Sequence, residues 1–221
     1  MNEVVLDTET TGLSVRDGHR IVEIGCIELS DLVPTVKKFH CYLNPERKVS
    51  EKALEVHGYT DDFLSNKKKF KEIADEFLDF IKDKRLIIHN AEFDISHLNN
   101  ELKILGKGEI KNDIVDTLVL ARDKFPGSSI SLDALCKRYR IDNTKRTLHT
   151  ALIDCDLLSK VYINLIDQKE PTFNLINNDE VIENYDNTSE VYFKKVILPT
   201  NEELESHQKY LKNDLKKNYF N

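Results

Sequence analysis

The chain has 221 residues, of which 40% are apolar, and this is enough for one sizeable domain with an appendage. No apolar run approaches the roughly 20 residues that cross a bilayer, and the start lacks the basic and apolar regions of a signal peptide, so we expect a cytoplasmic protein without membrane contact. The formal net charge of −7 argues against a protein that coats nucleic acid by charge alone, although it allows an enzyme that holds a chain end through metal ions.

The predicted elements begin with three strands, over residues 4–6, 21–29 and 39–43, joined by short or turn-rich connections. Connections of this kind indicate antiparallel pairing. Apolar side chains then recur at helical spacing over residues 70–81, which predicts an amphipathic helix.

Strands and helices alternate further along the chain. A short buried strand is expected over residues 85–90, followed by a helix over about 92–105. A second short strand, around residues 115–117, leads into another helix, and Ser131 is expected to cap the helix that follows. A long helix is predicted over about 149–166.

This order of elements predicts an α/β fold: a mixed sheet of three antiparallel strands and then parallel strands, flanked by helices, in a domain over residues 1–167. Residues 168–189 are rich in Asn, Asp and Glu and are expected to form a linker. The segment 190–221 has a strand-like run and then a capping box at Thr200 and Glu203. It is too small to have a core of its own, so we expect it to pack on the domain or to bind a partner.

Acidic residues interrupt three otherwise apolar faces. Asp7 and Glu9 lie at the end of the first strand and, being two residues apart, point to the same side. Asp94 and Asp154 each lie on the apolar face of a predicted helix. Any one of these residues alone could cap a helix or pair with an arginine, but four inward acids repel each other unless cations neutralise them.

An acidic cluster of this kind favours a particular metal chemistry. Carboxylates alone suit Mg²⁺ or Mn²⁺, and the four cysteines are scattered without a C-x-x-C pair, so we expect neither zinc nor disulfides. Two such ions about 4 Å apart form a phosphoryl-transfer site, in which one activates the attacking water and both stabilise the developing charge. His149 lies five residues before Asp154 and could accept the proton of that water, although a surface histidine is the alternative.

Three short stretches resemble the motifs of the DEDDh exonucleases: "DTETTG" from Asp7, "HNAEFD" ending at Asp94, and "HTALID" from His149 to Asp154. The stretches "EVHGYTDDFL" and "SLDALCKRYRIDNTKRTLHTALIDC" further resemble the epsilon subunits, which are the proofreading exonucleases of bacterial DNA polymerase III. The resemblance covers residues 1–167. It implies an RNase H-like fold and a 3′→5′ exonuclease that uses two divalent cations, Mg²⁺ or Mn²⁺, on the single-stranded 3′ end of DNA.

The resemblance also implies individual roles. Asp7 would bridge both metal ions, Glu9 and Asp154 would bind the first, and Asp94 would support the second, directly or through water. His149 would be the general base. Asp7, Glu9 and Asp154 would also contact the substrate.

His57, in "VHG", matches a family position that contacts the terminal nucleotide. Lys52 departs from the family, which commonly has an acid at this place, whereas here the acid is the neighbouring Glu51. A nucleotide contact at residue 52 is therefore not expected to follow the family pattern.

The tail resembles the segment through which epsilon subunits bind the catalytic subunit of the polymerase. In addition, "QKEPTF", from Gln168 to Phe173, falls where the family carries a peptide that binds the sliding clamp, although Pro171 replaces the usual aliphatic residue. A plain linker is the alternative for this peptide.

Two further functions remain open from the sequence: an RNA-trimming exonuclease of the same group, and a subunit that mainly stabilises the polymerase. A basic cluster before His149 could steer a phosphate backbone toward the acids or could simply be solvated; it consists of Lys137, Arg138, Arg140, Lys145 and Arg146.

Overall fold

The computed structural model describes residues 2–213, except for residues 145, 147 and 167–198. The chain divides into two units, whose described parts are residues 2–166 and 199–213, and each is considered by itself. The predicted linker and the strand-like run before Thr200 lie outside the described residues, so the predicted domain boundaries stay predictions.

A mixed sheet of five strands is the framework of the larger unit. The strand order is β3-β2-β1-β4-β5, with antiparallel pairing among the first three and parallel pairing of β1 with β4 and of β4 with β5. This is the predicted fold class. The strands are β1 (Asn2–Thr10), β2 (Ile21–Ser30), β3 (Val33–Tyr42), β4 (Arg85–Ile88) and β5 (Ile114–Asp116).

Seven α-helices and one short 3₁₀ helix accompany the sheet in the described part of this unit. The helix predicted over 70–81 is confirmed as α3, and Ser131 caps α6 by accepting a hydrogen bond from the Ala134 N–H at 3.3 Å. The helices are η1 (Val15–Asp17), α1 (Glu51–His57), α2 (Asp61–Ser65), α3 (Phe70–Ile81), α4 (Ala91–Ile104), α5 (Thr117–Lys124), α6 (Leu132–Tyr139) and α7 (Ala151–Leu165).

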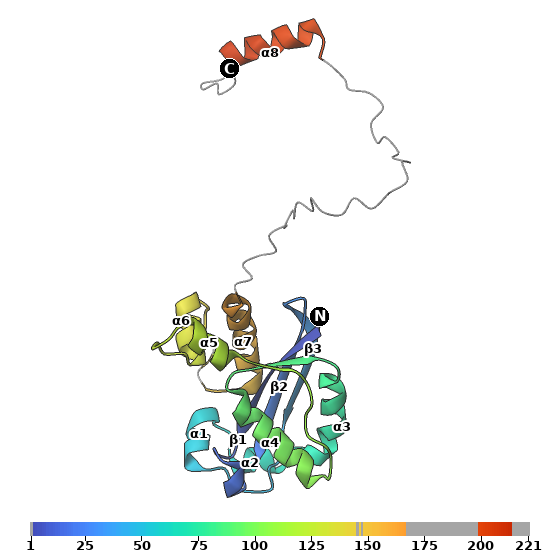
Figure 1. The fold of residues 1–221 in the computed structure, drawn as a ribbon, viewed down its shortest axis with the longest axis vertical. Helices are drawn as coiled ribbons and strands as arrows, with labels where there is room; N and C mark the ends of the chain where they lie inside the picture. Colours follow the sequence, from blue (N-terminus) through green and yellow to red (C-terminus); the bar gives the residue numbers. More distant parts are fainter. Residues whose placement is uncertain (1, 145, 147, 167–198, 214–221) are drawn as a thin grey trace, which may run out of the picture. The chain divides into compact units, whose positions relative to one another are not determined.

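Side chains of β1 alternate between two cores. Val4 and Leu6 belong to the core beneath α3 and α4, whereas Val5 belongs to the core beneath α7. Figure 1 shows α3 and α7 on opposite sides of the strands. Because side chains two residues apart share a face, Asp7 and Glu9 continue the Val5 side and are directed toward α7.

Helix α7 lies unusually close to β2. A Cβ atom on Gly25 would be 2.6 Å from the carbonyl carbon of Ala151 and 2.7 Å from the amide nitrogen of Leu152, so only glycine allows this approach. The helix begins at Ala151, so His149 lies two residues ahead of it and not in its first turn as the sequence had indicated.

The second unit contains α8 (Asn201–Asn213). The predicted capping box is present: the Thr200 hydroxyl accepts from the Glu203 N–H at 3.3 Å, and Glu203 accepts from the Thr200 N–H at 2.8 Å. Leu204 is 45% exposed on this helix. In the described part of the chain, no helix is long and apolar enough to cross a membrane.

Candidate active site

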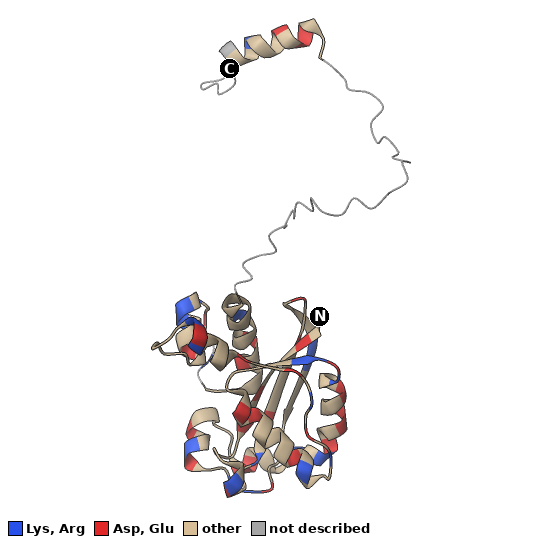
Figure 2. Ribbon diagram, in the orientation of Figure 1, with Lys and Arg blue, Asp and Glu red and all other residues tan. Residues whose placement is uncertain are grey.

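The acidic residues predicted from the sequence meet at the carboxyl ends of β1 and β4. The two strands run parallel, but only Glu3–Val5 of β1 pairs with β4, so the rest of β1 extends past the end of its neighbour. Crevices at the carboxyl ends of parallel strands are common ligand sites. Figure 2 shows acidic segments gathered where the start of α7 approaches the strands.

Three of the predicted residues lie close enough together to bind one metal ion. The nearest ligand atoms of Glu9, His149 and Asp154 all lie within 4.8 Å of one another. Asp7 and Asp94 line the same cavity, which has a volume of about 150 Å³. The structure therefore brings together all five of the acidic and histidine residues singled out in the sequence as catalytic.

Asp94 is fixed by the strand itself. Its Oδ1 accepts hydrogen bonds from the Thr8 N–H at 2.9 Å and from the Thr8 hydroxyl at 2.6 Å. The first turn of α4, which carries Asp94, is held in place by Asp116, whose carboxylate accepts from the Asn90 and Ala91 N–H groups at 3.0 Å. One oxygen of Asp94 is thus bound to β1, and the residue lines the cavity.

Ionisation of the acids in this cluster is electrostatically unfavourable. Burial, together with Asp94, Glu9 and Asp154, raises the pKa of Asp7 well above its ordinary value. Burial and then the charge of Asp154 raise the pKa of Glu9 to about 8. Burial also raises the pKa of Asp94 to about 7, although the hydrogen bonds from Thr8 oppose the shift. A site of this kind favours any added cation.

Asp154 behaves differently from the other three acids. Burial alone would raise its pKa, but the contacts with His149 and Arg146 outweigh this effect and lower the pKa below its ordinary value. Arg146 donates to both carboxylate oxygens, from Nε to Oδ1 at 2.5 Å and from Nη2 to Oδ2 at 2.7 Å. The sequence placed Arg146 in a basic cluster near the site, but its pairing with Asp154 was not foreseen.

The chain is similar in sequence to known exonucleases over most of its length. Residues 4–162 match the family described as "RNase_T: Exonuclease". The DNA polymerase III subunit epsilon of Rickettsia conorii is 48% identical over 228 residues, which cover 99% of each chain. The subunit of the same name from Escherichia coli is 47% identical over 169 residues, covering 73% of this chain and 70% of the relative.

The chain belongs to the exonuclease family, and within it to the DNA polymerase III epsilon subunits. Among solved structures, exonuclease X in complex with 5′-overhanging duplex DNA is 26% identical, with a TM-score of 0.59 over 74% of this chain and 90% of the other. The nuclease domain of 3′hExo, described as a DEDDh family member, is 16% identical with a TM-score of 0.63 over 75% and 91%, and shares the fold. The predicted RNase H-like fold and 3′→5′ exonuclease class are confirmed.

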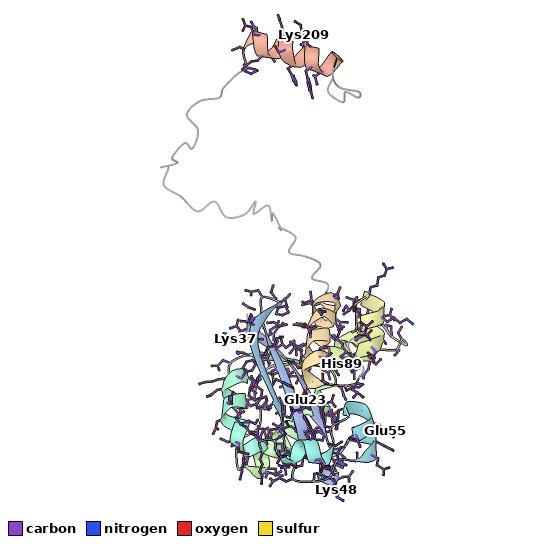
Figure 3. All side chains as sticks on the ribbon, turned by 180° about the vertical axis from the view of Figure 1, so that it is seen from behind. Glu23, Lys37, Lys48, Glu55, His89 and Lys209 are labelled. Atoms are coloured by element: carbon purple, nitrogen blue, oxygen red, sulfur yellow. The ribbon has the colours of Figure 1, made fainter. Side chains whose placement is uncertain are left out.

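Glu23 of this exonuclease was missed in the sequence. It lies on β2 opposite Glu9, is fully buried, and accepts hydrogen bonds from the His40 ring at 2.7 Å and the Tyr59 hydroxyl at 2.8 Å. It also accepts from the Ala151 N–H at 3.0 Å. Figure 3 shows Glu23 in the interior of the domain. Because a carboxylate at a helix N-terminus is favourable, Glu23 anchors the start of α7, which presents Asp154.

We expect Glu23→Gln to weaken both stability and catalysis. Glutamine can accept hydrogen bonds from only some of the three groups that donate to Glu23, so the free energy of unfolding should fall by about 1–3 kcal/mol. The rate of nucleotide removal from a 3′ end should fall as well. Thermal melts and exonuclease assays measure the two effects. Glu28→Gln is the matched control, because Glu28 lies on the same strand and contacts Lys37 and Lys84 away from the cavity; it should leave the rate unchanged.

His57 lies beside the acidic cavity, but both of its ring nitrogens make hydrogen bonds within the protein. It is 2% exposed, its Nε2 donates to the Thr10 carbonyl at 3.2 Å, and its Nδ1 accepts from the Tyr59 N–H at 3.0 Å. Burial lowers its pKa, which keeps the ring neutral. Both nitrogens are thus used, so any nucleotide contact of His57 would come from the face or a carbon edge of the ring.

A second cavity, of about 570 Å³, adjoins the acidic one and shares Glu9 and Phe93 with it. His57, Lys52 and Leu13 also line it, and Leu13 is 80% exposed. The peptide with Gln168 and Phe173, and Lys145 of the basic cluster, lie outside the described residues.

Proposed function

We propose that this exonuclease removes deoxynucleotides from the single-stranded 3′ end of DNA as the proofreading subunit of a cytoplasmic DNA polymerase III. The observation that carries the proposal is the convergence of Glu9, His149 and Asp154 within 4.8 Å, with Asp7 and Asp94 on the same cavity. The relatives named DNA polymerase III subunit epsilon support the choice of polymerase.

The residues present fit two divalent cations. The donors are carboxylate oxygens with one imidazole, which suit Mg²⁺ or Mn²⁺. The raised pKa values of Asp7, Glu9 and Asp94 indicate that the negative charge of these three acids is not neutralised within the protein. We propose that Asp7 is shared by both ions, that Glu9 and Asp154 hold the first, and that Asp94 supports the second. Bound there, the ions would supply Lewis-acid activation of water and stabilisation of the phosphoryl charge.

We propose that His149 acts as the general base. Its side chain is 44% exposed, so it reaches the solvent side of the cavity, and its Nδ1 lies 3.3 Å from Asp154 Oδ2. The His149 N–H donates to the Val56 carbonyl at 3.1 Å, which ties the histidine to α1. Proton transfer from the attacking water to a positioned histidine contributes typically about 10²–10⁴ in rate.

The larger cavity is the proposed place of the terminal nucleoside. Its walls combine the apolar side chains of Leu13, Ala53 and Val56 with the aromatic ring of Phe93, and it opens on Glu9. Such a surface suits a base and sugar, while the phosphate side faces the acids. Lys52 lies on this wall where the family commonly has an acid.

The activity is tested with a primer that carries a mismatched 3′ terminus. We expect release of mononucleotides from the 3′ end with Mg²⁺ or Mn²⁺ and none with chelator. RNA of the same sequence separates the two substrate classes: a higher rate on RNA would favour an RNA-trimming enzyme. An intact primer at every metal concentration would contradict the proposed function.

We further propose that the segment 190–221 binds the catalytic subunit of the polymerase, and that the peptide with Gln168 and Phe173 contacts the sliding clamp. The alignment with the Rickettsia conorii relative covers 99% of both chains, so it includes this tail. A chain that ends at Asp167 is expected to keep exonuclease activity and to lose co-purification with the polymerase. If the shortened chain bound as tightly as the full one, the tail would not be the docking segment.

A further inference from the structure

Arg146 occupies the acidic cluster as a cation of the protein itself. Its guanidinium contacts three side chains: both oxygens of Asp154, Asp133 Oδ2 at 2.7 Å, and His149 Nδ1 at 2.7 Å from Nη2. The arginine side chain is 7% exposed and that of Asp154 is 4% exposed. This is a buried, bidentate ion pair and not a surface contact.

The pair uses the carboxylate that the proposed first metal ion needs. A divalent ion on Asp154 would lie next to a guanidinium that donates to both oxygens of the same group. Like charges at such short range repel strongly in a partly buried site. The guanidinium and the ion therefore compete for Asp154.

The contact with His149 has a further consequence. An arginine side chain has only donors, so His149 Nδ1 must be the acceptor and carries no proton in this arrangement. The lone pair on Nδ1 is then occupied, and in the neutral ring the proton is on Nε2. In this metal-free arrangement neither ring nitrogen has a free lone pair, so His149 can accept a proton at Nδ1 only after the guanidinium has left it.

We infer that Arg146 is a resident counter-cation that holds Asp154 and His149 in place in the metal-free protein and leaves Asp154 when a divalent ion binds. Asp133, on α6, is the anchor that remains, because its contact is through Nη1, whereas Asp154 is held through Nε and Nη2. Arg146 is in this sense a positioning residue. The inference rests on the proposed role of Asp154 as a metal ligand.

Because Arg146 takes the place of a metal ion at Asp154, the acidic cluster stays assembled before metal binds. The pKa values of Asp7, Glu9 and Asp94 are raised, whereas the pKa of Asp154, which pairs with Arg146, is lowered. The geometry alone makes the same point: of the acids on the cavity, the described contacts pair only Asp154 with an arginine.

The test compares Mg²⁺ binding, measured by calorimetry, in the full-length wild type, Arg146→Gln and Arg122→Gln. Arg122 is exposed on α5 and controls for the loss of one positive charge. We expect Arg146→Gln to bind Mg²⁺ about tenfold more tightly than the wild type, equivalent to about 1.4 kcal/mol, and Arg122→Gln to bind like the wild type. Equal affinities in all three would overturn the inference and leave the proposed function standing, whereas no binding in any of them would contradict the proposed function.

A second measurement needs only the wild-type protein and so does not depend on the folding of a variant. In nitrogen-15 spectra of the imidazole at pH 8 without metal, His149 should show an unprotonated, hydrogen-bonded Nδ1. Saturation with Mg²⁺ should shift this resonance as the guanidinium moves. A resonance that is the same with and without Mg²⁺ would show that Arg146 does not leave its place.

Discussion

Asp7→Ala is expected to abolish exonuclease activity and to leave the melting temperature unchanged or higher. The side chain is the proposed shared ligand of both ions, and loss of several kcal/mol of transition-state stabilisation corresponds to at least roughly a thousandfold in rate. Stability should not fall, because burial and the neighbouring Asp94, Glu9 and Asp154 already raise the pKa of Asp7. Removing it relieves repulsion. Rate assays and thermal melts in chelator give the two results.

Glu3→Gln is the matched control for this substitution. Glu3 is a buried acid on the same face of β1, but it accepts from the Tyr162 hydroxyl at 3.0 Å and lies 3.6 Å from Arg85, away from the cavity. It should show the opposite pattern, with a lower melting temperature and an unchanged rate. A large loss of metal-free stability in Asp7→Ala would mark Asp7 as a structural acid instead.

Glu9 and Asp94 are expected to make the metal-free protein lose stability as the pH rises from about 5 to 8, against a smaller opposite contribution from the buried His57, whose pKa is lowered. The folded-state pKa of Glu9 is about 8 against an ordinary 4.5, and that of Asp94 is about 7 against 3.8. The folded protein therefore holds protons that the unfolded chain has released. The stability from these two groups is fully present below about pH 4 and is lost as the pH passes through the folded values. Asp154, whose pKa is lowered, is ionised in both states over this window and contributes no slope.

Divalent ions should reverse this trend, because they replace the same protons. Thermal melts over pH 5–8 in chelator and in Mg²⁺ measure the difference, and the Mg²⁺ affinity should increase with pH. Glu9→Gln is the control for the general rise of negative charge, since it removes one of the three acids with a raised pKa and should flatten the curve in chelator. Constant or rising stability of the metal-free wild type over this range would contradict the prediction.

Much of the site was predictable because each acid interrupts a clear periodic pattern of apolar residues. Asp94 shares a face of α4 with the buried Leu98, and Asp154 shares a face of α7 with the buried Leu158. Their convergence on β1 depends on the strand order β3-β2-β1-β4-β5, whereas the run of strands and helices indicated only a mixed sheet of antiparallel and then parallel strands. The two short helices α1 and α2 were not predicted, because five to seven residues give too few turns for an apolar period to appear.

The remaining parts of the site depend on contacts between distant residues. Glu23 lies in a strand that is buried on both faces, so alternation of apolar and polar residues does not separate it from an exposed acid. The signal that could have found it is a single acid within the run "IVEIGCI". Arg146 lies between α6 and α7, and only the path of that connection decides whether it meets solvent or Asp154.

Gly25 links this architecture to the proposed role in the accuracy of DNA copying. It pairs with Asp7 across β1 and β2, and its missing Cβ is what lets α7 approach β2 at Ala151. A methyl group at this position would push the start of the helix outward and carry Asp154 away from Glu9, with every charged residue still present. Replication errors would then go uncorrected because of a change in a residue that has no side chain and takes part in no chemistry.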